Sequence, residues 1–589
     1  MEKDRKRQLI EAKSLLSQGD LDAAQQAFRQ VIAAAGEDFR LYSKWAEYLD
    51  DADEKQSSRQ ILIQAHAMSE GDRRIQLALC DQLYRQGWQA DSLRLLPLPA
   101  KQEPAIECMV RIKILRVGGN SAEIVRLIRR LLATATLEVE RWAQLSALAQ
   151  ENRDPSLALA LHKKAMAAGP ATGPALARLA ELHLENKDLA RAQAAIADVP
   201  AIFENDESVL FTRARCAVKA GSEESAAMLF ERVLERNPQN GKAWFGLAAI
   251  APSGDLAELT SRCRYVLEGK NLKPEIASFV AFALGRLYER QDSHMQCFEC
   301  IDAANKMLKQ IWRAQGRPYK PRTVEGRRRI VVSRFNKQVM APFALAANDT
   351  PDPTPLFIVG MPRSGTTLLE KMLSLLNNVQ AGGENGALGK VVQRHPLSGD
   401  AAGGSDLADA TVLQELAAKY WTLTAHEGGI VTNKLPQNYF WLGWALAMFP
   451  AAPVIYLKRD PRDIGWSMFK QPFRPSFAYS VDQKHLAHAI SECDRYMDHW
   501  CHVAPGRILT VHYENLVADP KTVSKEIASF CGLEWRAQCL QPELAEGPSF
   551  TYSDLQVRKP INDRGVGAWR AYAQHLKPLC QGLAEAGLV

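Results

Sequence analysis

Residues 355–370 have the sequence Pro-Leu-Phe-Ile-Val-Gly-Met-Pro-Arg-Ser-Gly-Thr-Thr-Leu-Leu-Glu, an apolar run followed by a glycine-bracketed turn. The run Leu356 to Val359 predicts a buried parallel strand, and Thr366 to Leu376 predicts a helix with an apolar face. A strand, a glycine-rich turn and a helix together point backbone N–H groups and the positive end of the helix at one place. We therefore expect a phosphate-like anion to bind at this turn.

The turn has the spacing of a nucleotide-binding P-loop, with one difference. Gly360 and Gly365 bracket four residues, and Thr366 stands where a P-loop has its lysine. Because that lysine normally reaches the β- and γ-phosphates, its replacement argues against a nucleoside triphosphate and favours an anion closer to the loop. Arg363, inside the turn, would supply a fixed cation with planar fork-like donors.

The bulk properties indicate a soluble chain of two or more domains. The chain has 589 residues and a formal net charge of +6, which suits anionic ligands but is too small to indicate nucleic acid. We find no apolar run long enough to span a bilayer and no apolar signal-peptide core in the first residues. The eleven scattered cysteines are expected to be reduced thiols, so we expect a cytoplasmic location.

The first half of the chain repeats with a period of about 34 residues. Trp142, Leu176, Leu210 and Trp244 occupy equivalent positions, and small residues recur between them. This pattern resembles the tetratricopeptide repeat over about residues 5–306, which implies stacked antiparallel helix pairs. Such a solenoid offers a concave face to a peptide or partner protein, or it only scaffolds or dimerises the chain.

A basic connector and a second domain follow the repeats. The segment from Arg313 to Arg334 predicts a helix, which we expect to be solvated. The turn-rich segment 348–355 marks the entry to the second domain. We therefore predict a repeat solenoid at 1–306, a basic helical connector at 307–350 and a further domain at 351–589.

The second domain alternates strands and helices. Further strands are expected in segments 428–434, 453–458 and 507–513, with helices at 438–448, 462–470 and 481–502. Repeated strand–helix units imply a parallel sheet covered by helices on both faces, so the fold class is an all-α solenoid joined to an α/β domain. Ligands in such domains bind outside the carboxyl ends of the strands.

The motifs at those strand ends resemble the sulfotransferases, specifically the tyrosylprotein-sulfotransferase-like group and its bacterial fusions to tetratricopeptide repeats. The loop from Pro362 to Thr367 matches the family's 5′-phosphosulfate loop, and Gly383-Glu384 and Asn433-Lys434 match its Gly-Glu and Asn-Lys pairs. The resemblance implies the donor 3′-phosphoadenosine-5′-phosphosulfate, the product adenosine 3′,5′-bisphosphate and no metal. The donor-binding residues that it implies are Arg363, Ser364, Gly365, Thr366, Thr367, Arg459, Ser467, Tyr513, Arg558 and Lys559.

The resemblance also assigns catalytic roles, in which positioning and electrostatics dominate as in phosphoryl transfer. Glu384 would be the general base, Lys434 would neutralise charge on the bridging oxygen, and Arg363 would hold the transferred group. His485 and His488 are reserve candidates for the base. The animal enzymes of the group are membrane-anchored, disulfide-bonded Golgi proteins, so their location and substrate do not carry over to this chain.

The acceptor and the class of function stay open at this point. A tyrosine of a protein or peptide leads, and a carbohydrate or small metabolite is the alternative, because acceptor choice lies in loops such as 396–409. A P-loop kinase and a scaffold without catalysis are the alternatives from other classes. Cys297 and Cys300 have a metal-like spacing, but no second ligand pair follows, and structural zinc needs four ligands.

Overall fold

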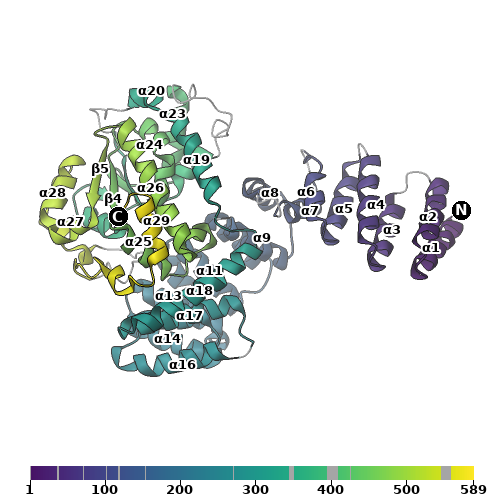
Figure 1. The fold of residues 1–589 in the computed structure, drawn as a ribbon, viewed down its shortest axis with the longest axis horizontal. Helices are drawn as coiled ribbons and strands as arrows, with labels where there is room; N and C mark the ends of the chain where they lie inside the picture. Colours follow the sequence, from purple (N-terminus) through teal and green to yellow (C-terminus); the bar gives the residue numbers. More distant parts are fainter. Residues whose placement is uncertain are drawn as a thin grey trace. The chain divides into compact units, whose positions relative to one another are not determined.

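A computed structural model gives the structure of residues 2–35, 39–69, 72–100, 103–116, 120–152, 154–269, 271–343, 351–393, 409–424, 426–545 and 559–589. These residues form two compact units, Met1–Val199 and Pro200–Val589, whose elements are labelled in Figure 1.

The first unit consists of paired helices. Several of them begin at a side chain that accepts hydrogen bonds from the first free N–H groups, as Asp154 does for Leu157 and Asp188 does for Arg191. Bulky residues fill the gaps between helices, and the rings of Phe28 and Trp45 stack at 4.7 Å. The helices are α1 (Glu2–Ser17), α2 (Leu21–Ala35), α3 (Phe39–Asp51), α4 (Lys55–Met68), α5 (Arg73–Arg85), α6 (Gln89–Arg94), α7 (Ala105–Leu115), α8 (Ser121–Thr134), α9 (Val139–Glu151), α10 (Pro155–Ala167), α11 (Gly173–Glu185) and α12 (Leu189–Ala197).

The helix pairs continue into the second unit, as the repeat predicts. Small residues let these helices approach closely, since a Cβ at Gly246 would lie 2.5 Å from the ring of Phe230. The elements are η1 (Ala201–Phe203), α13 (Glu207–Ala220), α14 (Glu223–Arg236), α15 (Gly241–Ile250), η2 (Ser253–Asp255), α16 (Leu256–Glu268), α17 (Pro274–Arg290) and α18 (His294–Ala314).

A five-stranded parallel sheet forms the centre of the second unit. Its strands are β1 (Thr354–Gly360), β2 (Val379–Gln380), β3 (Ile430–Asn433), β4 (Val454–Lys458) and β5 (Ile508–His512), in the order β2-β3-β1-β4-β5. This confirms the predicted α/β architecture. The sequence did not predict β2, because its two residues are too short to show a strand pattern.

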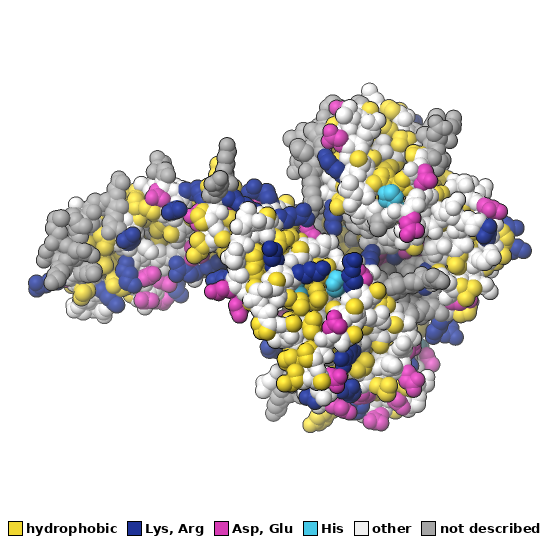
Figure 2. All heavy atoms as spheres, turned by 180° about the vertical axis from the view of Figure 1, so that it is seen from behind, with side chains coloured by type: hydrophobic (Ala, Val, Ile, Leu, Met, Phe, Trp, Pro, Cys, Tyr) yellow, Lys and Arg dark blue, Asp and Glu magenta, His cyan; other side chains and the backbone are white. Residues whose placement is uncertain are grey.

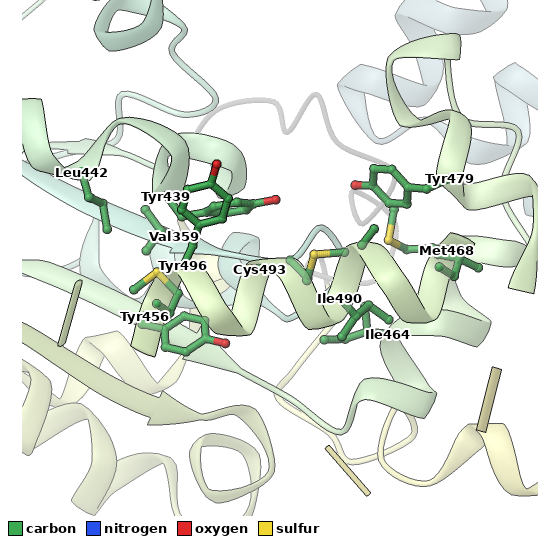
Figure 3. Packing of buried hydrophobic residues seen from close by; sticks show 14 of the residues in the cluster. Val359, Tyr439, Leu442, Tyr456, Ile464, Met468, Tyr479, Ile490, Cys493 and Tyr496 are labelled. Atoms are coloured by element: carbon green, nitrogen blue, oxygen red, sulfur yellow. The ribbon is translucent and has the colours of Figure 1, made fainter. Parts of the chain in front are cut away.

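Helices cover both faces of the sheet. Alternate side chains of β1 point to opposite sides. Leu356 and Ile358 pack with α21 (Thr366–Leu373) and α28 (Pro520–Phe530). Phe357 and Val359 pack with α24 (Leu442–Met448), α25 (Pro461–Phe469) and α26 (Gln483–Val503). Figure 3 shows Val359 and Tyr456 of the sheet beside Tyr496 of α26, and Ile464 beside Ile490 of the same helix. The elements are α21 (Thr366–Leu373), α22 (Ala387–Gln393), α23 (Ala410–Thr422), η6 (Pro436–Trp441), α24 (Leu442–Met448), α25 (Pro461–Phe469), η7 (Pro475–Val481), α26 (Gln483–Val503), α27 (Tyr513–Ala518), α28 (Pro520–Phe530), η8 (Ala537–Leu540), η9 (Pro542–Leu544), η10 (Ala568–Tyr572) and α29 (Lys577–Glu585).

The last helix pair of the repeat region shares a core with the sheet domain. Phe298 and Ile301 of α18 belong to the same hydrophobic cluster as Trp466 and Phe469 of α25. The amide of Asn305 donates to the carbonyl of Phe469 at 2.8 Å, and Lys470 pairs with Glu289 at 2.6 Å. Because the last repeat helices and the sheet domain share this core, the boundary at residue 306 stays a prediction about where the repeats end in the sequence.

The connector forms α19 (Pro321–Arg334), α20 (Lys337–Met340) and η3 (Ala341–Phe343). No residue of α19 is fully buried, as expected of a solvated helix, yet two of its arginines contact the sheet domain. The guanidinium of Arg327 lies 4.7 Å from the ring centres of both Phe440 and Trp441, and Arg328 pairs with Glu492 at 2.9 Å.

Over the ranges given above, no helix combines the length and apolar character needed to cross a lipid bilayer. All eleven cysteines are free thiols, as expected. On the face drawn in Figure 2, basic and acidic side chains are interspersed, as the small net charge suggests.

Candidate functional site

The turn after β1 is held in a backbone conformation that suits an anion. Arg363 has a φ of 72° and Gly365 a φ of 104°, both in the left-handed region. A Cβ at Gly365 would overlap the ring of Tyr513, so only glycine fits there. Ser364 is 0% exposed, and its hydroxyl has no hydrogen-bond partner among the described residues. The turn leads into α21, whose N-terminal N–H groups point toward the same place.

Two arginines meet above this turn. The Nε of Arg363 donates to the Oγ of Ser467 at 2.8 Å, and the Nη1 of Arg459 donates to the carbonyl of Arg363 at 2.7 Å. The other Nη of Arg459 donates to the carbonyl of Gly565, and its guanidinium lies 4.7 Å from the ring centre of Tyr513. Burial, together with the nearby positive charge of Arg459, lowers the pKa of Arg363 to about 10, so this side chain is still cationic at neutral pH.

The second pair of predicted residues lies at the ends of β2 and β3. The Nζ of Lys434 is 3.4 Å from the Oε1 of Glu384, although 50 residues separate them in the sequence. The Lys434 side chain is 2% exposed, whereas that of Glu384 is 39% exposed. The lysine is therefore buried, and the carboxylate is partly open to solvent.

Two buried carboxylates, one beside Lys434 and one near Arg459, were not among the predicted site residues. Glu370 of α21 contacts the Gly383 backbone, Thr432 and Lys434. Asp463 of α25 accepts hydrogen bonds from the N–H groups of Gly567 at 2.7 Å and Trp569 at 3.0 Å, and burial raises its pKa. In the sequence, the available signal was an acidic residue inside an otherwise apolar helical face.

The segment that follows the predicted donor-binding residues Arg558 and Lys559 is held mainly by α25. Arg558 lies outside the described residues, and Lys559 is exposed. The Asp463 hydrogen bonds and the Arg462 guanidinium, 4.1 Å from the Trp569 ring centre, fix residues 567–569. A cavity opens beside this segment, lined by Lys458, Arg459, Asp460, Pro461, Asp463, His512, Glu514, Val566, Gly567 and Arg570.

The two reserve histidines contact the segment around the connector. His488 uses both ring nitrogens, one with the hydroxyl of Tyr319 at 2.9 Å and one with the carboxylate of Glu325 at 3.0 Å. The ring of His485 lies 5.2 Å from that of Tyr319, and burial lowers its pKa. Because both nitrogens of His488 are engaged, its place favours a structural role.

The sequence spacing of Cys297 and Cys300 does not build a metal site within the part of the chain that the structure describes. No group of three or more His, Cys, Asp or Glu side chains is arranged there to hold a metal ion. The hydroxyl of Tyr572 lies 3.5 Å from the Sγ of Cys297, and burial raises the pKa of this thiol to about 12.

Comparison with known proteins supports both halves of this description. Residues 355–537 match the model of the sulfotransferase family, and residues 149–216 match that of the tetratricopeptide repeat. An uncharacterised protein of Aquifex aeolicus is 30% identical over 321 residues, covering 52% of this chain but only 41% of the relative. A putative protein-tyrosine sulfotransferase of Caenorhabditis briggsae is 26% identical over 227 residues, covering 36% of this chain and 80% of the relative.

Among solved structures, the sulfotransferase domain of a Synechococcus olefin synthase is 23% identical. The match covers 38% of this chain and 90% of the olefin synthase domain, with a TM-score of 0.28.

Proposed function

Because the chain contains a domain of the sulfotransferase family joined to tetratricopeptide repeats, we propose that it moves a sulfuryl group from 3′-phosphoadenosine-5′-phosphosulfate to an acceptor hydroxyl. The observation that carries the proposal is that one edge of the sheet brings together an arginine pair and a lysine–carboxylate pair. Arg363 and Arg459 supply positive charge at the turn after β1, and Lys434 with Glu384 lies at the ends of the neighbouring strands.

The residues present fit this donor. Two guanidinium groups within reach of one turn repel each other unless an anion lies between or beside them. The Nε of Arg459 and the hydroxyl of Ser364 have no hydrogen-bond partner among the described residues, so both can act as donors to phosphate or sulfate oxygens. Tyr513, already stacked under Arg459, offers an apolar ring to the nucleotide.

The donor supplies a sulfuryl group whose bond to the 5′-phosphate oxygen breaks as a bond to the acceptor oxygen forms. Arg363, Ser364 and the N–H groups from Gly365 to Thr367 hold the transferred group and the 5′-phosphate. Arg459 and Ser467 hold the 3′-phosphate, and Arg558 with Lys559 covers the nucleotide.

Lys434 and Glu384 are the residues to which we assign charge stabilisation and proton transfer. Lys434 stabilises the negative charge that remains on the bridging oxygen, and Glu384 takes the proton of the acceptor hydroxyl. The greater exposure of Glu384 supports this division, because a general base must reach a group that enters from solvent.

For the acceptor, we propose a tyrosine of a protein or peptide, supported by the relative named a putative protein-tyrosine sulfotransferase. A carbohydrate or small metabolite is the alternative, because residues 396–408 of the predicted acceptor loop 396–409 lie outside the described residues. We also propose that the repeats bind a peptide or partner protein, with a homodimer as the second possibility. The cytoplasmic location stays a prediction.

The first test is a thermal-shift comparison of adenosine 3′,5′-bisphosphate with Mg·ATP. A ligand at about one hundred times its dissociation constant should stabilise the chain by about 2.7 kcal/mol. We expect a shift with the bisphosphate alone in the wild type and its loss in Arg459→Ala, while Arg495→Ala, a surface control, keeps it. A shift with Mg·ATP alone would favour a kinase, and no shift with either ligand would favour a scaffold.

The acceptor is tested separately by incubation with the sulfur-radiolabelled donor. Label in tyrosine-containing peptides, absent from matched peptides with phenylalanine, is the expected result. Label that appears only in carbohydrate or small hydroxyl compounds would overturn the tyrosine assignment and leave the transfer chemistry standing.

A further inference from the structure

We infer that Glu370 is a positioning residue, which holds both the loop that carries Glu384 and the side chain of Lys434 in place for transfer. The inference rests on the proposed function and deepens it. Glu370 lies on the side of the Lys434–Glu384 pair that faces the protein interior. Because the interior side is away from the predicted acceptor, we distinguish Glu370 from the catalytic residues themselves.

The Glu370 carboxylate joins three separate segments of the chain. Its Oε1 accepts hydrogen bonds from the N–H of Gly383 at 2.9 Å and from the hydroxyl of Thr432 at 2.6 Å. Its Oε2 lies 3.7 Å from the Nζ of Lys434. One carboxylate of α21 therefore bonds to the loop after β2, to β3 itself and to the residue that follows β3.

The loop before Glu384 depends on these hydrogen bonds for its shape. Gly383 has a φ of 62°, and a Cβ at Gly382 would overlap the carbonyl of Thr432. The N–H of Gly382 donates to the Oγ1 of Thr432 at 3.1 Å. Because the same hydroxyl donates to Glu370, Thr432 links Glu370 to a second residue of the loop. Because Glu384 follows directly, the hydrogen bond to Gly383 sets where its side chain starts.

The two carboxylates beside Lys434, those of Glu370 and Glu384, differ in exposure and so can have different roles. A buried cation is costly unless a negative group accompanies it. The Glu370 side chain is 9% exposed, and that of Glu384 is 39% exposed. Glu370 can therefore remain as the permanent counter-charge of the lysine while Glu384 turns to an acceptor hydroxyl and takes its proton.

The place of Glu370 on its helix links this support to the donor loop. Thr366, the first residue of α21, and Glu370 are one helical turn apart and so lie on the same side of the helix. The short helix α21 thus begins at the end of the proposed phosphosulfate loop. One turn later it carries Glu370, which contacts Lys434 and the loop before Glu384.

The test separates the charge of Glu370 from its hydrogen bonds. Glu370→Gln keeps an Oε1 acceptor for Gly383 and Thr432 but removes the charge, and Glu370→Ala removes both. Glu492→Gln is the matched control, because that carboxylate is 2% exposed and pairs with two arginines, Arg328 of α19 and Arg495 of α26. All measurements use the full chain, and the exchange comparison is run both without and with adenosine 3′,5′-bisphosphate.

Three readouts are needed. Turnover is measured as release of 4-nitrophenol when sulfuryl is transferred from 4-nitrophenyl sulfate to the bisphosphate, which is the proposed reaction in reverse with a phenol as leaving group. Hydrogen exchange is measured on peptides that cover residues 379–386. The affinity for the bisphosphate shows whether donor binding is intact.

We expect Glu370→Gln to lower kcat about tenfold or more, with affinity for the bisphosphate within about twofold and exchange near that of the wild type. Glu370→Ala should lower kcat further and speed exchange in 379–386. Glu492→Gln should keep kcat within about twofold.

A Glu370→Gln variant with wild-type kcat would overturn the inference, as would a Glu370→Ala variant with unchanged exchange in 379–386. If Glu370→Ala does not fold, the kcat of the isosteric glutamine variant still decides whether the inference stands. A wild type that neither binds the bisphosphate nor transfers sulfuryl would defeat the proposed function instead, and the exchange comparison would still test the hold of Glu370 on the loop.

Discussion

The Nε of Arg363 donates a 2.8 Å hydrogen bond to the Oγ of Ser467, two residues that lie 104 positions apart in the sequence. This bond joins the turn after β1 to the helix after β4, two adjacent strands of the sheet. The proposed sites for the 5′-phosphosulfate and the 3′-phosphate are therefore in direct contact. A donor that carries both groups would find their ligands already arranged as one surface.

Removal of the Ser467 hydroxyl should weaken donor binding without harming the fold. Ser467→Ala takes away one proposed ligand of the 3′-phosphate and the partner of Arg363. A hydrogen bond to a charged group contributes about 1.5–3 kcal/mol, so we expect affinity for adenosine 3′,5′-bisphosphate to fall about tenfold or more. Titration calorimetry measures this. The control is Ser491→Ala in α26, a similarly buried serine that bonds to its own helix, and equal losses in both variants would contradict the prediction.

Replacement of Glu384 or Lys434 should abolish turnover while donor binding largely survives. Loss of a general base costs about 10²–10⁴-fold in rate, so Glu384→Gln, which keeps the shape of the side chain, should show a decrease of this size in kcat. Lys434→Ala should do the same, with an added loss of stability because Glu370 then lacks its buried cation. Steady-state rates with the radiolabelled donor check both, and a Glu384→Gln enzyme of near-normal kcat would place the base elsewhere.

A side chain at Gly365 should disrupt the donor loop. The positive φ of 104° and the overlap with Tyr513 make Gly365→Ala strained, by about 1–3 kcal/mol. We expect a lower Tm and a loss of bisphosphate binding. Gly326→Ala is the control and should raise the Tm. Gly326 lies in α19 with nothing within 4 Å of a new Cβ, and alanine favours a helix. A Gly365→Ala variant that binds the bisphosphate normally would show that the turn can relax.

The stability of the repeat unit should fall in mild acid. Burial lowers the pKa of His162 below its usual 6.5, and its Nε2 lies 2.9 Å from the carbonyl of Ala175. Well above pH 6.5 the folded and unfolded states are both neutral at this residue. As the pH falls through 6.5, the unfolded state takes up a proton that the folded state resists, and stability is lost. His162→Gln should flatten the fall in Tm below pH 6.5, whereas an unchanged slope would assign the effect to other groups.

The local parts of this protein follow from short stretches of sequence. The turn from Gly360 to Gly365, its cation at Arg363 and the helix that follows are determined by glycine backbone freedom and by periodic apolar residues. The same holds for the repeating helices, because each pair packs only on its neighbours and the period is visible in the chain. Even so, the helix predicted to run to Leu376 ends at Leu373, since helix ends depend on local hydrogen bonds that a periodic pattern does not contain.

The approach of distant residues depends on the order of the strands, which only the tertiary structure provides. Lys434 meets Glu384 because β2 and β3 are neighbours in the sheet, and Arg459 meets Arg363 because β4 lies beside β1. The resemblance to a family placed these residues in one site, yet nothing in their spacing along the chain required it. The buried role of Glu370 was out of reach for the same reason, because its three partners come from segments that become adjacent only when the sheet forms beside α21.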